Sequence, residues 1–394
     1  MVVKRGLLLA VGSALALVLT AATPMMAVGG EALPSPLRAA NLLRVKAIAT
    51  NGVIKPGIVA VGYQEASKPG QLYVAWSNDR GTDFRKANGK LRRYRVVGDP
   101  ARGMSLAICA GRIWIGTAWH DSGDKAGDSD VILTSRTIKG GAAQALMTNT
   151  SEDHRVSDVS VNCVSGKLLA VSWLEKSGSQ TKARLMLRSV EPLGTTPAYE
   201  QVIDLGPADF RGGLSAAAIP QQVAVAFVRN GDLRLHRLAV QDNQAGVGSQ
   251  KTIVWKGVRN PKIAARRNRL AVTYSDAGKV KAKLSRDRGV RLSKPYLLAR
   301  TGGTRHPSLP WSIDVVGGNV VATASVYTPT TGKSVPKRIS TSDFGQTWRT
   351  RTYGNRGARL DAILKSKKQP ARLLEAWHNN APKGRADTLR ARYE

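Results

Sequence analysis

A strand-like pattern that recurs about every fifty residues constrains the fold of this chain more than any other feature. Each copy is a short apolar run, most often ending in an aromatic residue and followed by a polar segment. The copies span residues 59–63, 115–119, 169–173, 223–227, 270–274, 321–326 and 373–377. Their last residues lie 56, 54, 54, 47, 52 and 51 positions apart. Self-similarity at a period of this size is typical of a repeat architecture.

Each copy lies within a longer unit with the pattern of four short strands. A first apolar strand, such as 105–108 or 261–264, precedes the recurring strand across a short turn. A third strand, such as 130–135, follows a polar loop, and a less regular fourth strand closes the unit. Four antiparallel strands joined by short turns form one blade of a β-propeller. The sequence therefore predicts an all-β propeller of seven four-stranded antiparallel blades, or of six if the divergent unit near 48–90 forms none.

The N-terminus has the pattern of a secretory signal peptide. Lys4 and Arg5 precede an apolar run over residues 6–22, and small residues follow. This order is typical of an exported chain, and no later segment is apolar for long enough to cross a bilayer. We expect residues 1–27 to be a signal peptide, 28–47 an N-terminal segment and 48–394 the propeller of a secreted, extracellular protein. An uncleaved signal anchor is the alternative.

The formal net charge of +33 at pH 7 bears on partners more than on fold. Outside a cell, such a charge favours polyanions: acidic glycans, anionic cell-wall polymers, phospholipid head groups or stray nucleic acid. No motif that reads nucleic acid is present, so we expect acidic glycans or wall polymers. The alternative is that the charge only keeps the protein soluble.

Three units carry a Ser/Thr-x-Asp-x-Gly turn after their third strand. Residues 341–348 fit Ser/Thr-x-Asp-x-Gly-x-Thr-Trp throughout, 77–84 have Asp83 in place of the Thr and another aromatic residue, Phe84, in place of the Trp, and 285–289 keep the first half. Hydroxyl and carboxylate side chains hydrogen-bond the backbone of such turns, and glycine takes an angle that a Cβ disfavours. We therefore expect a structural role for Ser77, Asp79, Gly81, Asp287, Gly289, Asp343, Gly345 and Trp348.

This turn resembles the Asp-box, or BNR repeat, of sialidases and related β-propellers, and the resemblance covers essentially the whole chain after the signal peptide. It implies that the Asp-box turns lie on the face away from an active site. Sialidases bind a substrate carboxylate with three arginines and use a Tyr–Glu nucleophile pair and an Asp acid. Their first arginine usually lies in a Phe/Tyr-Arg-Ile/Leu-Pro segment, and Arg44 occupies that region without the motif.

An arginine stands just before the first strand of six units, which in a propeller borders the channel mouth on the ligand-binding face. We expect these arginines to form an anion-binding crown, unless the abundance of Lys and Arg, 60 of 394 residues, produces the pattern by chance. The six are Arg102, Arg155, Arg211, Arg259, Arg305 and Arg359.

Acid–base chemistry needs a carboxylate of suitable position and pKa. Asp158 and Asp361 lie near the starts of first strands, Glu175 and Glu375 in or just after recurring strands, and Tyr327 after the sixth. These are the catalytic candidates, and the alternative for each is a solvated or salt-bridged group.

Cys109 and Cys163 each lie ten residues before the tryptophan that ends a recurring strand. Equivalent positions in neighbouring blades, in an exported protein, predict a disulfide; two buried thiols are the alternative, should the positions lie too far apart. The acidic loop 120–130 is a possible Ca²⁺ site, but its spacing is not that of an EF-hand and Lys125 opposes a cation. We expect no metal or other cofactor.

Three functions fit these observations. The first is a recognition propeller that binds acidic glycans or anionic wall polymers, without catalysis. The second is an exo-acting glycosidase of the sialidase-like kind, and the third is an extracellular protein-binding scaffold. The missing arginine segment and the positive charge favour the first.

Overall fold

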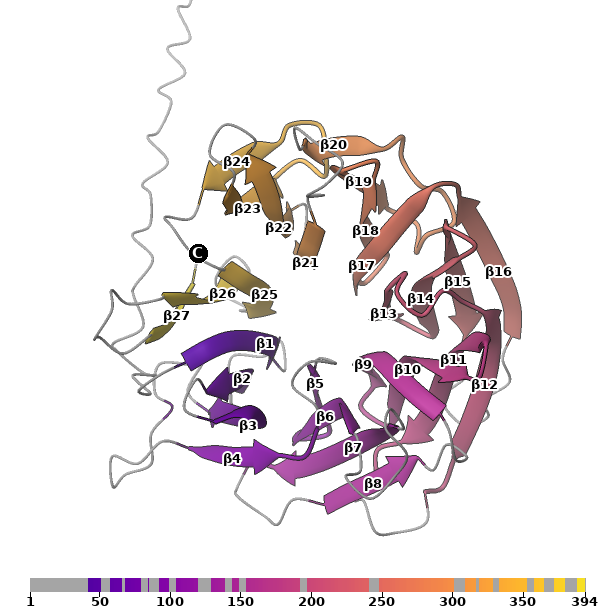
Figure 1. The fold of residues 1–394 in the computed structure, drawn as a ribbon, viewed down its shortest axis with the longest axis vertical. Helices are drawn as coiled ribbons and strands as arrows, with labels where there is room; N and C mark the ends of the chain where they lie inside the picture. Colours follow the sequence, from indigo (N-terminus) through magenta and orange to yellow (C-terminus); the bar gives the residue numbers. More distant parts are fainter. Residues whose placement is uncertain are drawn as a thin grey trace, which may run out of the picture.

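The structure, a computed structural model, is an all-β ring of sheets (Figure 1). Its described residues form six four-stranded sheets and one three-stranded sheet, all with antiparallel pairing. The β-propeller predicted from the repeat is confirmed. The structure describes residues 42–50, 57–65, 68–78, 84, 92–98, 104–119, 129–138, 144–148, 154–191, 197–240, 248–300, 309–316, 319–328, 333–352, 358–364, 372–379 and 388–393.

The sheets follow one another along the chain, and the first strand begins at Leu42. The strands are β1 (Leu42–Thr50), β2 (Val59–Glu65), β3 (Lys68–Ser77) and β4 (Arg93–Val96); β5 (Met104–Cys109), β6 (Arg112–Trp119), β7 (Asp130–Thr137) and β8 (Gln144–Thr148); β9 (His154–Ser165), β10 (Leu168–Ser177), β11 (Gln180–Ser189) and β12 (Glu200–Pro207); β13 (Leu214–Ile219), β14 (Gln222–Arg229), β15 (Asp232–Ala239) and β16 (Gly248–Trp255); β17 (Val258–Arg266), β18 (Arg269–Asp276), β19 (Lys279–Ser285) and β20 (Tyr296–Ala299); β21 (Leu309–Val316), β22 (Asn319–Thr328), β23 (Lys333–Thr341) and β24 (Arg349–Thr352); β25 (Ala358–Leu364), β26 (Arg372–Asn379) and β27 (Thr388–Tyr393).

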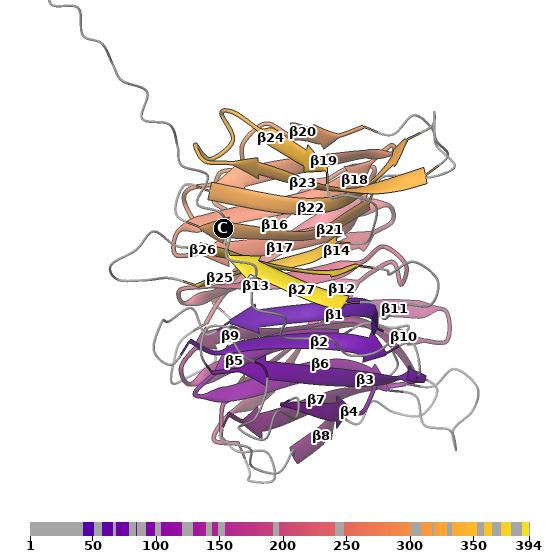
Figure 2. The ribbon, with the colours of Figure 1, turned by 90° about the vertical axis from the view of Figure 1, so that its left-hand side faces the viewer.

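The first strand of each sheet lies innermost, around the ring axis, and β1 packs beside β25 to close the ring (Figure 1). Seen from the side, the strands run across the ring between its two faces (Figure 2). We call the face where the innermost strands begin the strand-start face. The turns after the third strands lie on the opposite face, here called the Asp-box face. Among the described residues, no helix has the length and apolar character needed to cross a bilayer.

The recurring apolar runs are the second strands of the sheets. In β10, every residue from Leu168 to Glu175 is buried, because other strands flank both edges and neighbouring sheets cover both faces. A continuous apolar run is the pattern of a strand buried on both faces. The sheets approach closely: a Cβ on Gly116 of β6 would collide with the side chain of Val161 in β9.

Cys109 and Cys163 form the disulfide predicted from their equivalent positions. Cys109 ends β5 and Cys163 lies in β9, the innermost strands of neighbouring sheets. Their Cα atoms are 5.4 Å apart, within the range that a disulfide spans. The bond therefore joins two successive sheets near the ring axis.

Replacing both cysteines, as Cys109→Ser with Cys163→Ser, should lower the free energy of unfolding by about 2–4 kcal/mol, because the bond restricts the unfolded chain. Urea denaturation of both proteins measures the difference. Reduction of the wild type should give the same loss, and unchanged stability in both experiments would contradict a structural role.

The Asp-box turns hold themselves together through side-chain-to-backbone hydrogen bonds. In the complete turn, the Gly345 amide donates to Thr341 Oγ1 at 2.9 Å, and the Thr347 amide donates to Asp343 Oδ1 at 2.9 Å. Gly345 has a φ of 101°, which favours glycine, and Trp348 packs against Tyr296 of the preceding sheet.

The turn after β19 repeats this arrangement. The Gly289 amide donates to Ser285 Oγ at 2.7 Å, and the Arg291 amide to Asp287 Oδ1 at 2.9 Å. Ser77 is buried at the end of β3, whereas Asp79 and Gly81 lie outside the described residues. In both described turns, the hydroxyl and carboxylate side chains hydrogen-bond the backbone of the turn itself, as expected of a structural motif.

The complete Asp-box should make stability depend on acid pH. Hydrogen bonds from Thr341 and Thr347 hold the pKa of Asp343 well below its ordinary value. A carboxyl with a depressed folded-state pKa contributes stability above its unfolded pKa, near 4, and this contribution is lost as pH falls toward the folded value. We expect Asp343→Asn to flatten the fall in stability below about pH 4, measured by urea denaturation at several pH values. If the free energy of unfolding fell equally with pH in the two proteins, Asp343 would not contribute to the acid dependence of stability.

Candidate functional site

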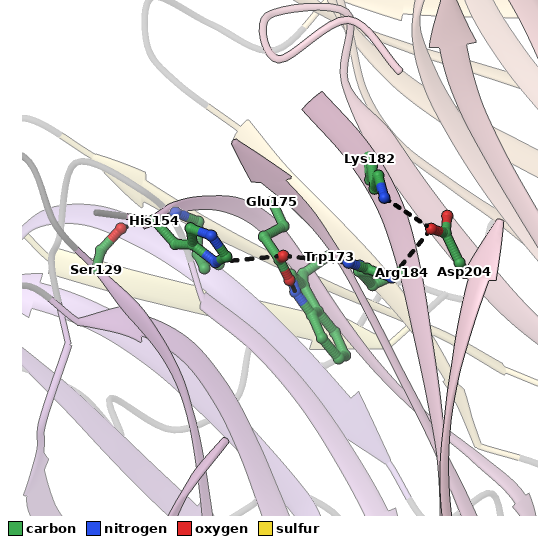
Figure 3. Close-up of polar contacts among 8 residues, drawn as sticks. Ser129, His154, Trp173, Glu175, Lys182, Arg184 and Asp204 are labelled. Carbon is green, nitrogen blue, oxygen red and sulfur yellow. Dashed lines mark hydrogen bonds and ion pairs between the residues drawn. The ribbon is translucent and has the colours of Figure 1, made fainter. Parts of the chain in front are cut away.

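A polar network lies on the strand-start face of the β9–β12 sheet (Figure 3). Its members come from all four strands of this sheet and from the residue before β7. Cross-strand pairing brings them together, because Arg184 lies opposite Trp173 and Lys182 opposite Glu175. We call it the Glu175 network, and it contains Ser129, His154, Trp173, Glu175, Lys182, Arg184 and Asp204.

Glu175 is the centre of the network, and its side chain is only 9% exposed. The indole Nε1 of Trp173 donates to Oε2 at 3.3 Å. Oε1 lies 3.4 Å from Nη2 of Arg184 and 3.3 Å from Nδ1 of His154. Burial of a carboxylate is costly without such partners. Both oxygens of Glu175 are therefore engaged by groups of the protein itself.

The network extends outward to solvent through Arg184. Its Nη1 lies 3.1 Å from Oδ2 of Asp204, and Nζ of Lys182 lies 3.3 Å from the same oxygen. The side chains of Lys182 and Asp204 are 41% and 40% exposed, so this end is screened by water. Arg184 thus links a buried carboxylate to a solvated one.

Hydrogen bonds of Ser129 connect the network to the neighbouring β5–β8 sheet. The Ser129 amide donates to the carbonyl of His154 at 2.7 Å, and its Oγ accepts from the amide of Val156 at 2.7 Å. The start of β9, which carries His154 and Arg155, is therefore held in place by the β5–β8 sheet.

Three arginines of the predicted crown have described side chains, and all three are exposed. Arg155 and Arg259 are the second residues of β9 and β17, and Arg211 precedes β13 by three positions. They lie at the starts of three successive innermost strands. Arg102, Arg305 and the side chain of Arg359, the second residue of β25, lie outside the described residues, so a six-membered crown stays a prediction.

Asp158, the second candidate carboxylate described, lies at an irregularity of β9. Its φ is 52°, and Asn260 has the same φ at the corresponding irregularity of β17. Burial raises the pKa of Asp158 above its ordinary value, while the charge of Lys262 and a hydrogen bond from Ser157 oppose the rise. Bulges commonly redirect side chains beside functional sites.

The remaining candidates have described backbones only. Asp361 and Glu375 are register partners in β25 and β26, and Tyr327 lies in β22 opposite Ser334. Their side chains lie outside the described residues, as do residues 120–128 of the acidic loop. Their catalytic and Ca²⁺-binding roles therefore stay predictions.

Sequence reasoning did not find the Glu175 network. Its members His154, Arg184 and Asp204 lie 21, 9 and 29 positions from Glu175 in the chain. One signal was present: acidic and basic residues at strand ends that meet on one face of a predicted sheet. Predicting these contacts requires the register between neighbouring strands. The repeat does not give this register, because its period varies along the chain.

Glu175→Ala should lower the free energy of unfolding by about 1–3 kcal/mol, because it leaves the buried indole N–H of Trp173 and Nη2 of Arg184 without this acceptor. Asp204→Ala, at the solvated end, should cost less than about 1 kcal/mol. Urea denaturation of the two variants measures both values, and equal losses would contradict the central position of Glu175.

The sequence matches no protein-family model and no curated protein. Among solved structures, the fold is similar to the GH93 α-L-arabinofuranosidase of Fusarium graminearum, with a TM-score of 0.47, 12% identity and coverage of 91% of this chain and 96% of that chain. It is also similar to a subtype N11 neuraminidase-like protein of A/flat-faced bat/Peru, with a TM-score of 0.46, 11% identity and coverage of 92% and 91%. The fold is similar as well to the phage phi92 endosialidase, with a TM-score of 0.41 and 9% identity; the match covers 91% of this chain and 68% of that chain. The ring of sheets makes the chain a β-propeller, and its two described Ser/Thr-x-Asp-x-Gly turns have the side-chain-to-backbone hydrogen bonds of a structural motif.

Proposed function

We propose that this chain is an exported propeller that binds acidic glycans or anionic cell-wall polymers on its strand-start face, without catalysis. One observation carries the proposal: Arg155, Arg211 and Arg259 are exposed at the starts of three successive innermost strands. Guanidinium groups pair with carboxylates through two parallel hydrogen bonds. We call these three residues the arginine row, and such a row suits a ligand that carries several carboxylates.

The charges around the Glu175 network support an anionic ligand. Lys176 lies opposite Arg155 in the β9–β10 pair, and Lys182 and Arg184 follow on β11. The acids of this corner, Glu175 and Asp204, are both engaged by Arg184. Positive charge is therefore in excess where the arginine row begins.

The state of Glu175 favours binding over catalysis. A general acid or base must reach the substrate and exchange a proton with it. Glu175 is buried, and both of its oxygens are paired within the protein. It acts in this proposal as the group that holds Arg184 and His154 in place.

Export is supported by two features of the chain. The N-terminal 27 residues have the order of charged, apolar and small residues typical of a signal peptide. The Cys109–Cys163 disulfide suits an oxidising compartment.

Asp158 favours a second candidate function, an exo-acting glycosidase. Its pKa is raised by burial, as in carboxyl groups that donate a proton at a glycosidic oxygen. In this alternative, Asp158 is the acid and the arginine row binds a substrate carboxylate.

Reversing the arginine row, as Arg155→Glu with Arg211→Glu and Arg259→Glu, should weaken binding of oligogalacturonates or sialylated oligosaccharides by about tenfold or more. Isothermal titration calorimetry measures the affinity. The matched control, Arg267→Glu with Arg291→Glu and Lys294→Glu, makes the same change of charge on the Asp-box face. Equal losses in the two variants would contradict a site on the strand-start face.

The same oligosaccharides, followed over hours by proton NMR, separate the two functions. We expect line broadening of ligand signals without new free-sugar signals. Release of sugar by the wild type, abolished in Asp158→Asn, would replace the binding function with the glycosidase.

A further inference from the structure

A second concentration of positive charge lies on the Asp-box face, at the end of the β17–β20 sheet opposite Arg259. The turn between β17 and β18 and the Asp-box turn after β19 lie side by side there. The amide of Arg288 donates to the carbonyl of Asn268 at 2.7 Å, and its Nε donates to Asn268 Oδ1 at 2.9 Å. We call these residues the basic patch: Arg266, Arg267, Arg269, Arg286, Arg288, Arg291 and Lys294.

The segments that form the patch contain few acids. Within residues 266–269 and 286–294 the one acid is Asp287, which accepts hydrogen bonds from Ser285 Oγ and the Arg291 amide inside its own turn. Asp314 of β21 lies near enough to Arg266 for that charge to affect its carboxyl. Arg267, Arg286, Arg291 and Lys294 are exposed.

The guanidinium groups at the edge of the patch are held in position. Arg269 and Arg286 both lie over the ring of Phe344, with Cζ 5.2 and 5.3 Å from its centroid. Phe344 belongs to the Asp-box of the next sheet, so the patch reaches the boundary between two sheets. Cation–π contact fixes these side chains, and fixed cations lose less conformational entropy when they bind an anion.

An apolar side chain projects among these cations. Val290, between Gly289 and Arg291 of the Asp-box turn, is 55% exposed. A bilayer surface offers anionic phosphates to the arginines and an apolar boundary to the valine.

From this combination we propose that the basic patch docks the protein on membrane surfaces that contain anionic phospholipids. The chain would lie on the bilayer, with Val290 at the head-group boundary. Because the patch and the arginine row lie at opposite ends of β17, the strand-start face then points away from the membrane. A docked protein keeps that face open to soluble or wall-bound ligands.

Co-sedimentation of the purified full chain with lipid vesicles tests this docking. The vesicles contain phosphatidylcholine alone, or phosphatidylcholine with about one third phosphatidylglycerol. We expect binding to the anionic vesicles that weakens with salt. Arg267→Glu with Arg291→Glu and Lys294→Glu should weaken it by about tenfold or more, whereas the Arg155, Arg211 and Arg259 triple reversal, with the same charge, should retain it. Thermal denaturation checks that both triple variants are folded.

Val290→Ser separates a lipid surface from a soluble polyanion. It should weaken vesicle binding severalfold while leaving the affinity for inorganic polyphosphate unchanged. Three results would each overturn the proposal: no binding of the wild type to anionic vesicles, equal losses in the two triple variants, or vesicle binding insensitive to Val290→Ser. The glycan affinities of the same triple variants decide the strand-start face separately, so one proposal can fail without the other.

Discussion

Face-to-face packing of neighbouring sheets around the ring is the constraint on which the rest of this structure depends. A second strand such as β10 carries apolar side chains on both faces, and a single sheet leaves both of them exposed to water. Stacking a sheet on each side buries them, as the shared cluster of Leu174, Leu185 and Phe227 shows. Because every sheet needs a neighbour on each side, the series of sheets closes into a ring, with β25 packed beside β1.

Each strand runs from one face of the ring to the other (Figure 2). The starts of the innermost strands gather on one face, and the turns after the third strands gather on the other. Arg259 and Arg267 lie only eight positions apart in the sequence, yet β17 places them on opposite faces. A strongly basic chain thereby presents two positive surfaces with different surroundings. One adjoins the Glu175 network, and the other surrounds the exposed Val290.

Several features were predictable because they depend on local sequence or on the repeat alone. The apolar runs became second strands, and the equivalent positions of Cys109 and Cys163 placed them in contact across neighbouring sheets. The Asp-box contacts of Asp343 and Gly345 close within a few residues of chain. The Glu175 network was not predictable, because His154 and Arg184 meet Glu175, and Asp204 meets Arg184, only through the register of three strand pairs.

By itself, the sequence determined that this chain is a ring of antiparallel sheets with Asp-box turns, since apolar periodicity and turn residues act over short stretches. Only the tertiary structure decided that Glu175 is paired with Arg184, that Asp158 lies near enough to Lys262 for that charge to affect its carboxyl, and that Arg269 and Arg286 share the ring of Phe344. The physical reason is the range of the forces involved. Electrostatic and aromatic contacts depend on distances of a few ångströms between segments that the chain order leaves far apart.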